Sequence, residues 1–174
     1  MRKPALYQQR CWLIVPSANL SCLTERPFMI LLNTWQTPFG LAPFDKISDS
    51  DFSPAMDKAL ETALASILKI AESSEIPTFE NTIIAQEDAE AVLEQVASVF
   101  YTLAGCDSNV VREELQREFA PKVSAYSSTV SSNKKLFERI EYLWSNRVSL
   151  NLSPEQERVL MPVSYTHLRA HETG

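Results

Sequence analysis

The sequence predicts an all-α fold: an array of antiparallel amphipathic helices, preceded by an extended arm rich in aromatic residues and proline. Three observations support this prediction. Apolar residues recur every three or four positions through most of residues 53–161, and no stretch alternates as a half-buried strand does. Residues that favour helix caps precede these stretches. Only 3 residues are glycine, which the tight turns of β-hairpins require.

The arm spans residues 33–47, where Pro38, Gly40 and Pro43 are spaced too closely for a helix. Its larger apolar side chains are Trp35, Phe39, Leu41 and Phe44. An isolated arm of this kind would not stay ordered in water. We therefore expect it to pack against a neighbouring surface.

The first helix is predicted to begin at Ser53 as N-cap, with Pro54 at the first helical position. Its apolar stripe fades before Pro77 and consists of Met56, Leu60, Leu64, Leu68 and Ala71. The second helix has Thr78 as candidate cap and runs for about 25 residues, or about 38 Å. Gly105 follows its last apolar residue, where a left-handed residue commonly ends a helix.

The third helix has three candidate caps, Asp107, Ser108 and Asn109. Its stripe is strongly periodic and consists of Val111, Leu115, Phe119, Val123, Tyr126 and Val130. Pro121 lies inside this stripe and is predicted to kink or split the helix.

The fourth helix is predicted to begin after Ser132 and Asn133 and to bury Leu136, Phe137, Ile140, Leu143 and Trp144. Ser153 and Gln156 have the spacing of a capping box, which predicts a fifth helix. Its apolar pattern is cut off after Met161.

Both ends differ from the helical region that we assign to residues 33–162. Residues 1–32 show no sustained period, and we interpret them as a leader or a misassigned start, with Met29 a candidate native start. We predict that this segment is disordered. Residues 163–174 resemble the translation of a sequencing adapter and are excluded from the predicted fold. They contain the only two histidines, His167 and His171, for which we expect no metal role.

Composition excludes several classes of function. The net charge of -6 argues against a nucleic-acid partner, which would require a basic face. No apolar run approaches the roughly 20 residues that a membrane span needs, and we expect a cytoplasmic protein. The cysteines are Cys11, Cys22 and Cys106. This odd number without a C-x-x-C pair predicts neither a disulfide framework nor a zinc site, and Cys106 is interpreted as a reduced thiol.

No catalytic, cofactor-binding or metal-binding residue is predicted. The paired carboxylates are Asp49 with Asp51, Glu87 with Asp88, and Glu113 with Glu114. Such neighbours do not face each other on a helix, so we interpret them as solvated surface. Arg139, Arg147 and Arg158 could bind a substrate carboxylate, but surface positions with the stem over an apolar patch are favoured.

Four blocks carry a family resemblance: TPFGLAPFDKI at residues 37–47, FSPA at 52–55, PTFENTI at 77–83 and VASVFYTLAG at 96–105. In this order they resemble the amino-terminal part of M3-family zinc metallopeptidases. The peptidyl-dipeptidase branch, also called dipeptidyl carboxypeptidase, is the most similar. The resemblance covers residues 33–161.

The resemblance implies a helical enzyme with two lobes around a channel that admits short peptides and releases dipeptides from their C-termini. Zinc is held in that family by an H-E-x-x-H helix and a further glutamate, which belong to the C-terminal part. That motif is absent from this sequence, so no zinc ligand is transferred and none is expected to bind here. The expected partners are short peptides and the catalytic lobe of the parent enzyme.

Two functions are therefore weighed. One is an N-terminal fragment of a zinc peptidyl-dipeptidase or oligopeptidase, itself inactive, whose helices help to wall the substrate channel. The other is a stand-alone helical interaction module without enzymatic activity. The unfinished last helix and the unpartnered arm favour the fragment.

Overall fold

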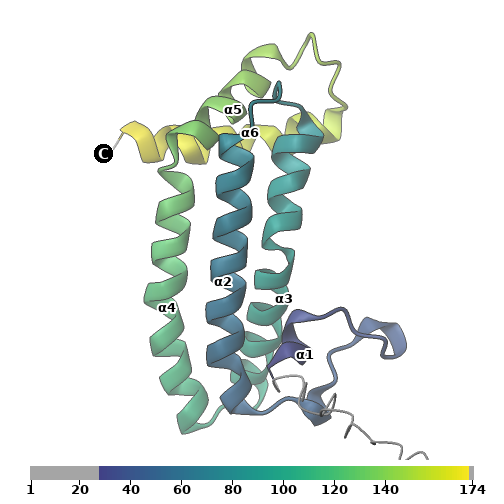
Figure 1. Ribbon diagram of the computed structural model, residues 1–174, viewed down its shortest axis with the longest axis vertical. Helices are drawn as coiled ribbons and strands as arrows, with labels where there is room; N and C mark the ends of the chain where they lie inside the picture. The colour runs from purple at the N-terminus through teal and green to yellow at the C-terminus, as the bar shows by residue number, and fades with distance from the viewer. Residues whose placement is uncertain (1–27, 173–174) are drawn as a thin grey trace, which may run out of the picture.

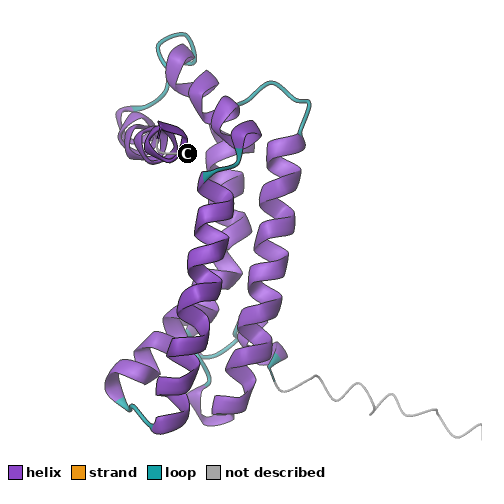
Figure 2. Ribbon diagram, turned by 90° about the vertical axis from the view of Figure 1, so that its left-hand side faces the viewer, coloured by secondary structure: helices purple, strands orange, loops and turns teal. Residues whose placement is uncertain are grey.

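The structure is a computed structural model that describes residues 28–172, with side chains described as far as residue 163. Over that range it contains six α-helices, three short 3-10 or π turns and no strand (Figure 2). The predicted all-α class is confirmed. Within the same residues, no helix is both long enough and apolar enough to cross a membrane.

Three long helices form the body of the molecule: α2 (Asp49–Glu72), α3 (Ala85–Cys106) and α4 (Val110–Ser131). Helix α3 runs antiparallel to the other two, whereas α2 and α4 run parallel, as the pairs Asp49–Arg112 and Asp57–Lys122 show, so the predicted antiparallel arrangement holds only for α3. Figure 1 shows α2 between α3 and α4. Two further helices, α5 (Lys134–Asn146) and α6 (Pro154–Glu172), lie across one end of this body. The short helix α1 (Met29–Leu32) and the arm lie at the other end.

Helix α2 begins five residues before its predicted start, at Asp49 instead of Pro54. Ser48 is the N-cap and forms a capping box with Asp51, whose carboxylate accepts hydrogen bonds from the backbone N–H and the hydroxyl of Ser48, both at 2.9 Å. The prediction of Ser53 as N-cap is therefore wrong, because the earlier box already satisfies the helix terminus. Pro54 lies inside the helix instead of at its first position.

Thr78 caps the second helical segment as predicted, in a reciprocal pair of hydrogen bonds with Asn81 at 2.8 and 3.1 Å. The segment opens with an unpredicted π turn, η4 (Glu80–Ile84), before α3. The prediction of Gly105 as a left-handed C-cap is wrong. Gly105 lies within α3, and Asp107 is the C-cap, with its N–H bonded to the carbonyl of Leu103 at 2.8 Å.

Side-chain caps confirm the predicted starts of the last three helices. Asn109 caps α4 by accepting from the N–H of Arg112, and Asn133 caps α5 by accepting from that of Leu136. Ser153 and Gln156 form the capping box of α6. Helix α4 passes through Pro121 without being split.

Helix α6 continues to Glu172, beyond its predicted end at Met161 and through most of the segment excluded from the predicted fold. Leu168, Arg169 and Ala170 are good helix formers, which favours continuation of the backbone once the capping box has started the helix. The origin of residues 163–174 is a separate matter and stays a prediction.

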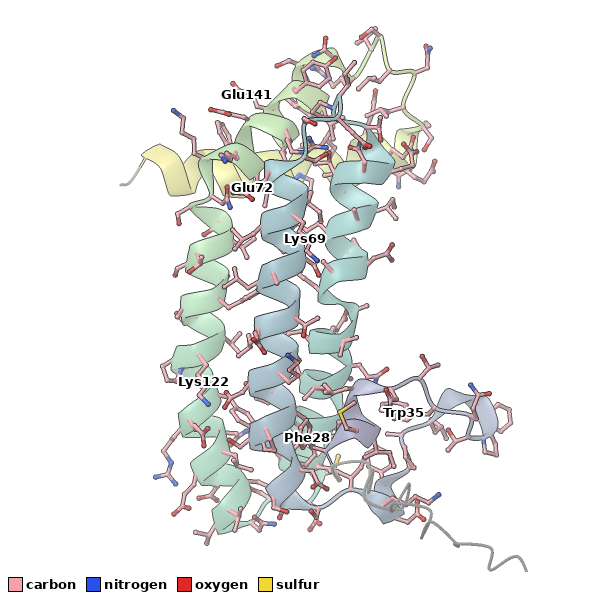
Figure 3. The ribbon with its side chains drawn as sticks, in the orientation of Figure 1. Phe28, Trp35, Lys69, Glu72, Lys122 and Glu141 are labelled. Atoms are coloured by element: carbon pink, nitrogen blue, oxygen red, sulfur yellow. The ribbon has the colours of Figure 1, made fainter. Side chains whose placement is uncertain are left out.

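The arm is irregular, with two 3-10 turns, η2 (Pro38–Gly40) and η3 (Phe44–Lys46). Figure 3 shows Trp35 in the arm beside α1, and its indole N–H donates to the carbonyl of Ile30 at 2.7 Å. Phe39, in contrast, is 99% exposed. Only the start of the arm and a few later residues pack on the body, so the predicted packing is partial.

The predicted boundary at residue 33 lies too late. Leu31 in α1 is fully buried, and Gln95 donates to the carbonyl oxygens of Leu31 and Asn33 at 2.8 and 3.2 Å. Residues 28–32 are therefore packed onto α3 and are not disordered. The rest of the predicted leader, residues 1–27, lies outside the described residues, as do Cys11 and Cys22.

Two hydrophobic clusters fill the interior. The aromatic cluster lies at the α1 end around Phe52, Phe100 and Phe119. The ring centroids of Phe52 and Phe119 lie 5.2 and 4.8 Å from that of Phe100, with edge-to-face geometry. The α5 cluster lies at the opposite end and consists of Ile67, Ala71, Phe79, Ile83, Val130, Leu136, Ile140, Leu143 and Leu160.

Candidate functional site

The predicted carboxylate pairs do not form an acid–base site. Asp49 accepts from Arg112 Nε at 2.7 Å and from Asn109 Nδ2 at 2.9 Å, whereas Asp51 is occupied in the capping box with Ser48. Burial alone would raise the pKa of Asp49. The hydrogen bonds from Asn109 and Arg112, together with the Arg112 charge, lower it overall. Asp49 is therefore an ionised structural link between α2 and α4.

The other two pairs, Glu87 with Asp88 and Glu113 with Glu114, are exposed, as predicted. Among the described side chains, no group of three or more His, Cys, Asp or Glu residues could hold a metal ion. These residues do not fit the zinc that the family resemblance implies, so no chemical step through zinc is assigned to them. His167 and His171 lie beyond the described side chains.

Arg139 is buried, not on the surface as predicted; only 6% of it is exposed. Its Nη1 donates to the carbonyl oxygens of Ser73 and Glu75 at 3.1 and 3.0 Å. Its Nη2 donates to Asn81 Oδ1 at 2.8 Å and to Thr82 Oγ1 at 3.2 Å. One guanidinium thus ties α5 to the end of α2 and to the π turn.

The electrostatics of Arg139 follow from its burial. Burial lowers its pKa, and the charge of Glu75 partly opposes that shift. Its Nε is buried without a hydrogen-bond partner. Both terminal nitrogens are already occupied by protein acceptors, so little of the guanidinium is free to bind a substrate carboxylate.

The two other arginines have surface roles, as predicted. Arg147 lies over the ring of Trp144, with its guanidinium carbon 4.4 Å from the ring centroid. Arg158 contacts Glu155 at 3.4 Å, and both side chains are largely exposed. Cys106 is a free, exposed thiol at the end of α3.

Two hollows on the surface of α3 are the features that sequence analysis missed. The first, of about 350 Å³, lies between α3 and α4, and its apolar lining includes Leu93, Ala97, Val123 and Tyr126. The second, of about 400 Å³, is lined by residues of the π turn and α6 and by Glu87, which lines both hollows. The periodicity of the sequence indicates that α3 is amphipathic. It does not indicate which part of the apolar face of α3 stays exposed after α2 has packed against it.

Tyr126 and Glu90 both line the first hollow. The phenol donates to Glu90 Oε1 at 2.7 Å and joins α4 to α3. Burial, with a smaller contribution from the hydrogen bond and charge of Glu90, raises the pKa of Tyr126. Tyr126 therefore remains a neutral hydrogen-bond donor at any physiological pH.

Comparison with known proteins shows which family the chain resembles. No family model matches the chain. Two curated proteins match the chain in sequence, and both are peptidases by name.

The first is the dipeptidyl carboxypeptidase of Escherichia coli strain K12, which is 29% identical over 137 residues, covering 79% of this chain and 20% of the relative. The second is the dipeptidyl carboxypeptidase of Salmonella typhimurium strain LT2, which is 31% identical over 130 residues, covering 75% of this chain and 19% of the relative. These matches confirm the resemblance to M3-family peptidyl-dipeptidases. The chain spans about a fifth of the length of either relative.

Proposed function

We propose that this chain forms part of the amino-terminal lobe of a zinc-dependent peptidyl-dipeptidase that hydrolyses short peptides and releases dipeptides from their C-termini. The similarity to two dipeptidyl carboxypeptidases over three quarters of the chain carries this proposal. An all-helical body agrees with the helical lobe that the resemblance implies.

In this proposal the chain supplies structure and no chemistry. Zinc, held by residues outside this chain, would activate the attacking water in the parent enzyme. The rigid face made by α2, α3 and α4 would help to wall the substrate channel, limiting the size of substrates and excluding water from the reaction. The Asp49–Arg112 link and the Arg139 network hold these helices in fixed positions.

An exchange enzyme tests the proposal. Residues 28–163 of this chain would replace the matching segment of the Escherichia coli dipeptidyl carboxypeptidase, and dipeptide release from a short peptide would be measured. If the two segments are equivalent lobes, kcat/KM stays within about tenfold of the parent, a change of about 1.4 kcal/mol in the activation barrier. A folded exchange enzyme with no zinc-dependent activity would contradict the proposal.

Solution behaviour separates this proposal from a stand-alone interaction module. Ile76 and Val148 are 72% and 79% exposed, in addition to Phe39 in the arm. A lobe removed from its parent is expected to bind a hydrophobic dye under native conditions and to self-associate. A cooperative melt of a monomer that does not bind the dye would favour the module.

A further inference from the structure

The two hollows adjoin at Glu87, which lines both of them. We call the two together the tract, which extends from Ile84 at the end of η4 to Tyr101 near the end of α3. The seventeen helical steps from Ile84 to Tyr101 correspond to a length of about 26 Å. Ile84 and Tyr101, at the two ends, are 45% and 44% exposed. The tract is therefore long enough to take four to five turns of a helix laid beside α3, by about 5.4 Å per turn.

The charges along the tract all have one sign. The charged residues that line it are Glu87, Glu90, Glu94 and Glu155, and no lysine or arginine lines either hollow. Glu87, Glu90 and Glu94 follow at steps of three and four, which places them on one side of α3. The tract thus combines an apolar floor with an acidic rim.

The apolar and acidic residues that line the tract indicate the kind of segment that could bind there. An apolar stripe would cover Leu93 and Ala97, and lysine or arginine residues on its flank would meet the three glutamates. A second copy of this chain does not fit well, because its net charge is -6. Its partly buried basic groups are also occupied: Arg112 pairs with Asp49, and Lys122, on α4 in Figure 3, pairs with Asp57 and Glu118.

We infer that the tract is a docking surface for a basic amphipathic helix from the remaining part of the longer protein. The inference rests on the proposed function, because that proposal makes the chain a lobe of a larger polypeptide. The curated relatives are about five times as long as the segment that matches this chain, so most of such a polypeptide is available to supply the helix. Helix-in-groove packing of this kind combines apolar anchors with flanking charges.

Photo-crosslinking in the exchange enzyme tests the inference. A benzophenone amino acid would replace Tyr101, which lines the tract, or Tyr142 on α5, which is similarly exposed at 40% and serves as the control. The expected product from position 101 is a cross-link to a helical segment outside residues 28–163 that carries a net positive charge. Cross-links from position 142 should not reach that segment.

A charge variant supplies the second measurement. Glu87→Gln with Glu94→Gln keeps the shape of both side chains and removes two charges that have no ion-pair partner within 4.0 Å among the described residues. We expect the yield from position 101 to fall by about threefold or more at low salt, and the loss to shrink at high salt because exposed charges are screened. Glu113→Gln with Glu114→Gln, on the exposed face of α4, is the matched control.

Three results would overturn the inference: cross-links confined to residues 28–163, cross-links to a neutral or acidic segment, or a yield that the charge variant leaves unchanged. Dipeptide release by the same exchange enzyme is scored separately. An active enzyme without the cross-link rejects only the docking surface. An inactive enzyme with the cross-link rejects the proposed function and keeps the docking surface.

Discussion

The two ends of the helical body are stabilised in different ways. The aromatic cluster contains three phenylalanine rings, and the ring of Phe100 makes edge-to-face contacts with those of both Phe52 and Phe119. The α5 cluster instead adjoins a buried arginine whose four hydrogen bonds reach residues 57 to 66 positions away. Apolar packing is non-directional, whereas a guanidinium network requires each acceptor in its place. The α5 end is therefore the part of the molecule whose geometry is more sharply specified.

The largest effect is expected in the aromatic cluster. Phe100→Ala removes the central ring, which is fully buried, and leaves a cavity between Phe52 and Phe119. We expect the free energy of unfolding to fall by about 4 kcal/mol, measured by urea denaturation. Tyr142→Ala, at an exposed position, is the control and should change stability by less than about 1 kcal/mol. Equal losses for the two variants would contradict this packing.

Arg139→Met tests the network at the other end. The substitution keeps an unbranched apolar stem but removes the Arg139 donor from the carbonyl oxygens of Ser73 and Glu75 and from the side chains of Asn81 and Thr82; Asn81 keeps its bond from the N–H of Thr78. We expect a loss of about 3 kcal/mol in unfolding free energy. Arg139→Lys should recover only part of it, because an ammonium lacks the planar fork.

Arg158→Met is the matched control for the Arg139 variants, since its ion pair with Glu155 is exposed and should contribute under about 1 kcal/mol. A more stable Arg139→Met protein would show that desolvation of the guanidinium outweighs its hydrogen bonds. In that case the two ends would not differ in the way described above.

The link between α2 and α4 should depend on pH. The pKa of Asp49 is lower in the folded protein than the value of about 3.9 for an unfolded chain. Its stabilising contribution is therefore complete above the unfolded pKa and is lost as pH falls through the folded one. Asp49→Asn should cost about 1 kcal/mol at pH 7, measured from urea midpoints, and the difference from the parent should shrink towards pH 2. An equal difference at both pH values would contradict the ionic contribution.

The smallest effect concerns the start of α6. Ser153→Ala removes the hydroxyl that accepts from the N–H of Gln156 at 3.2 Å. We expect a loss of about 1 kcal/mol, which a thermal melt of the two proteins would detect. Ser149→Ala, in the preceding turn, removes no helix cap and is the control. A control that destabilises as much as Ser153→Ala would exclude a specific capping contribution.

Local signals made most of the fold predictable. Thr78, Asn109, Asn133 and Ser153 cap their helices through partners only three residues away, and such bonds can be inferred from spacing alone. The start of α2 was missed because Pro54 gave a competing local signal, although Ser48 already satisfied the helix terminus.

The buried network could not be predicted, because it depends on contacts between distant parts of the chain. Nothing local to Arg139 distinguishes it from Arg147 or Arg158, and only the placement of α5 against Ser73 and Asn81 buries it. The tract on α3 was missed for a related reason. Periodicity marks an apolar face but does not tell how much of it the neighbouring helices cover.

The measurement that most directly tests the central claim is the substrate-size selectivity of the exchange enzyme. The rate of cleavage of a short peptide would be divided by that of a folded protein with an accessible C-terminal tail, for the exchange enzyme and for its parent. If this chain forms part of the channel wall, the two ratios agree within about threefold, or under 1 kcal/mol in relative barrier. An enzyme that cleaves the short peptide at the parental rate but also cleaves the folded protein would contradict the account.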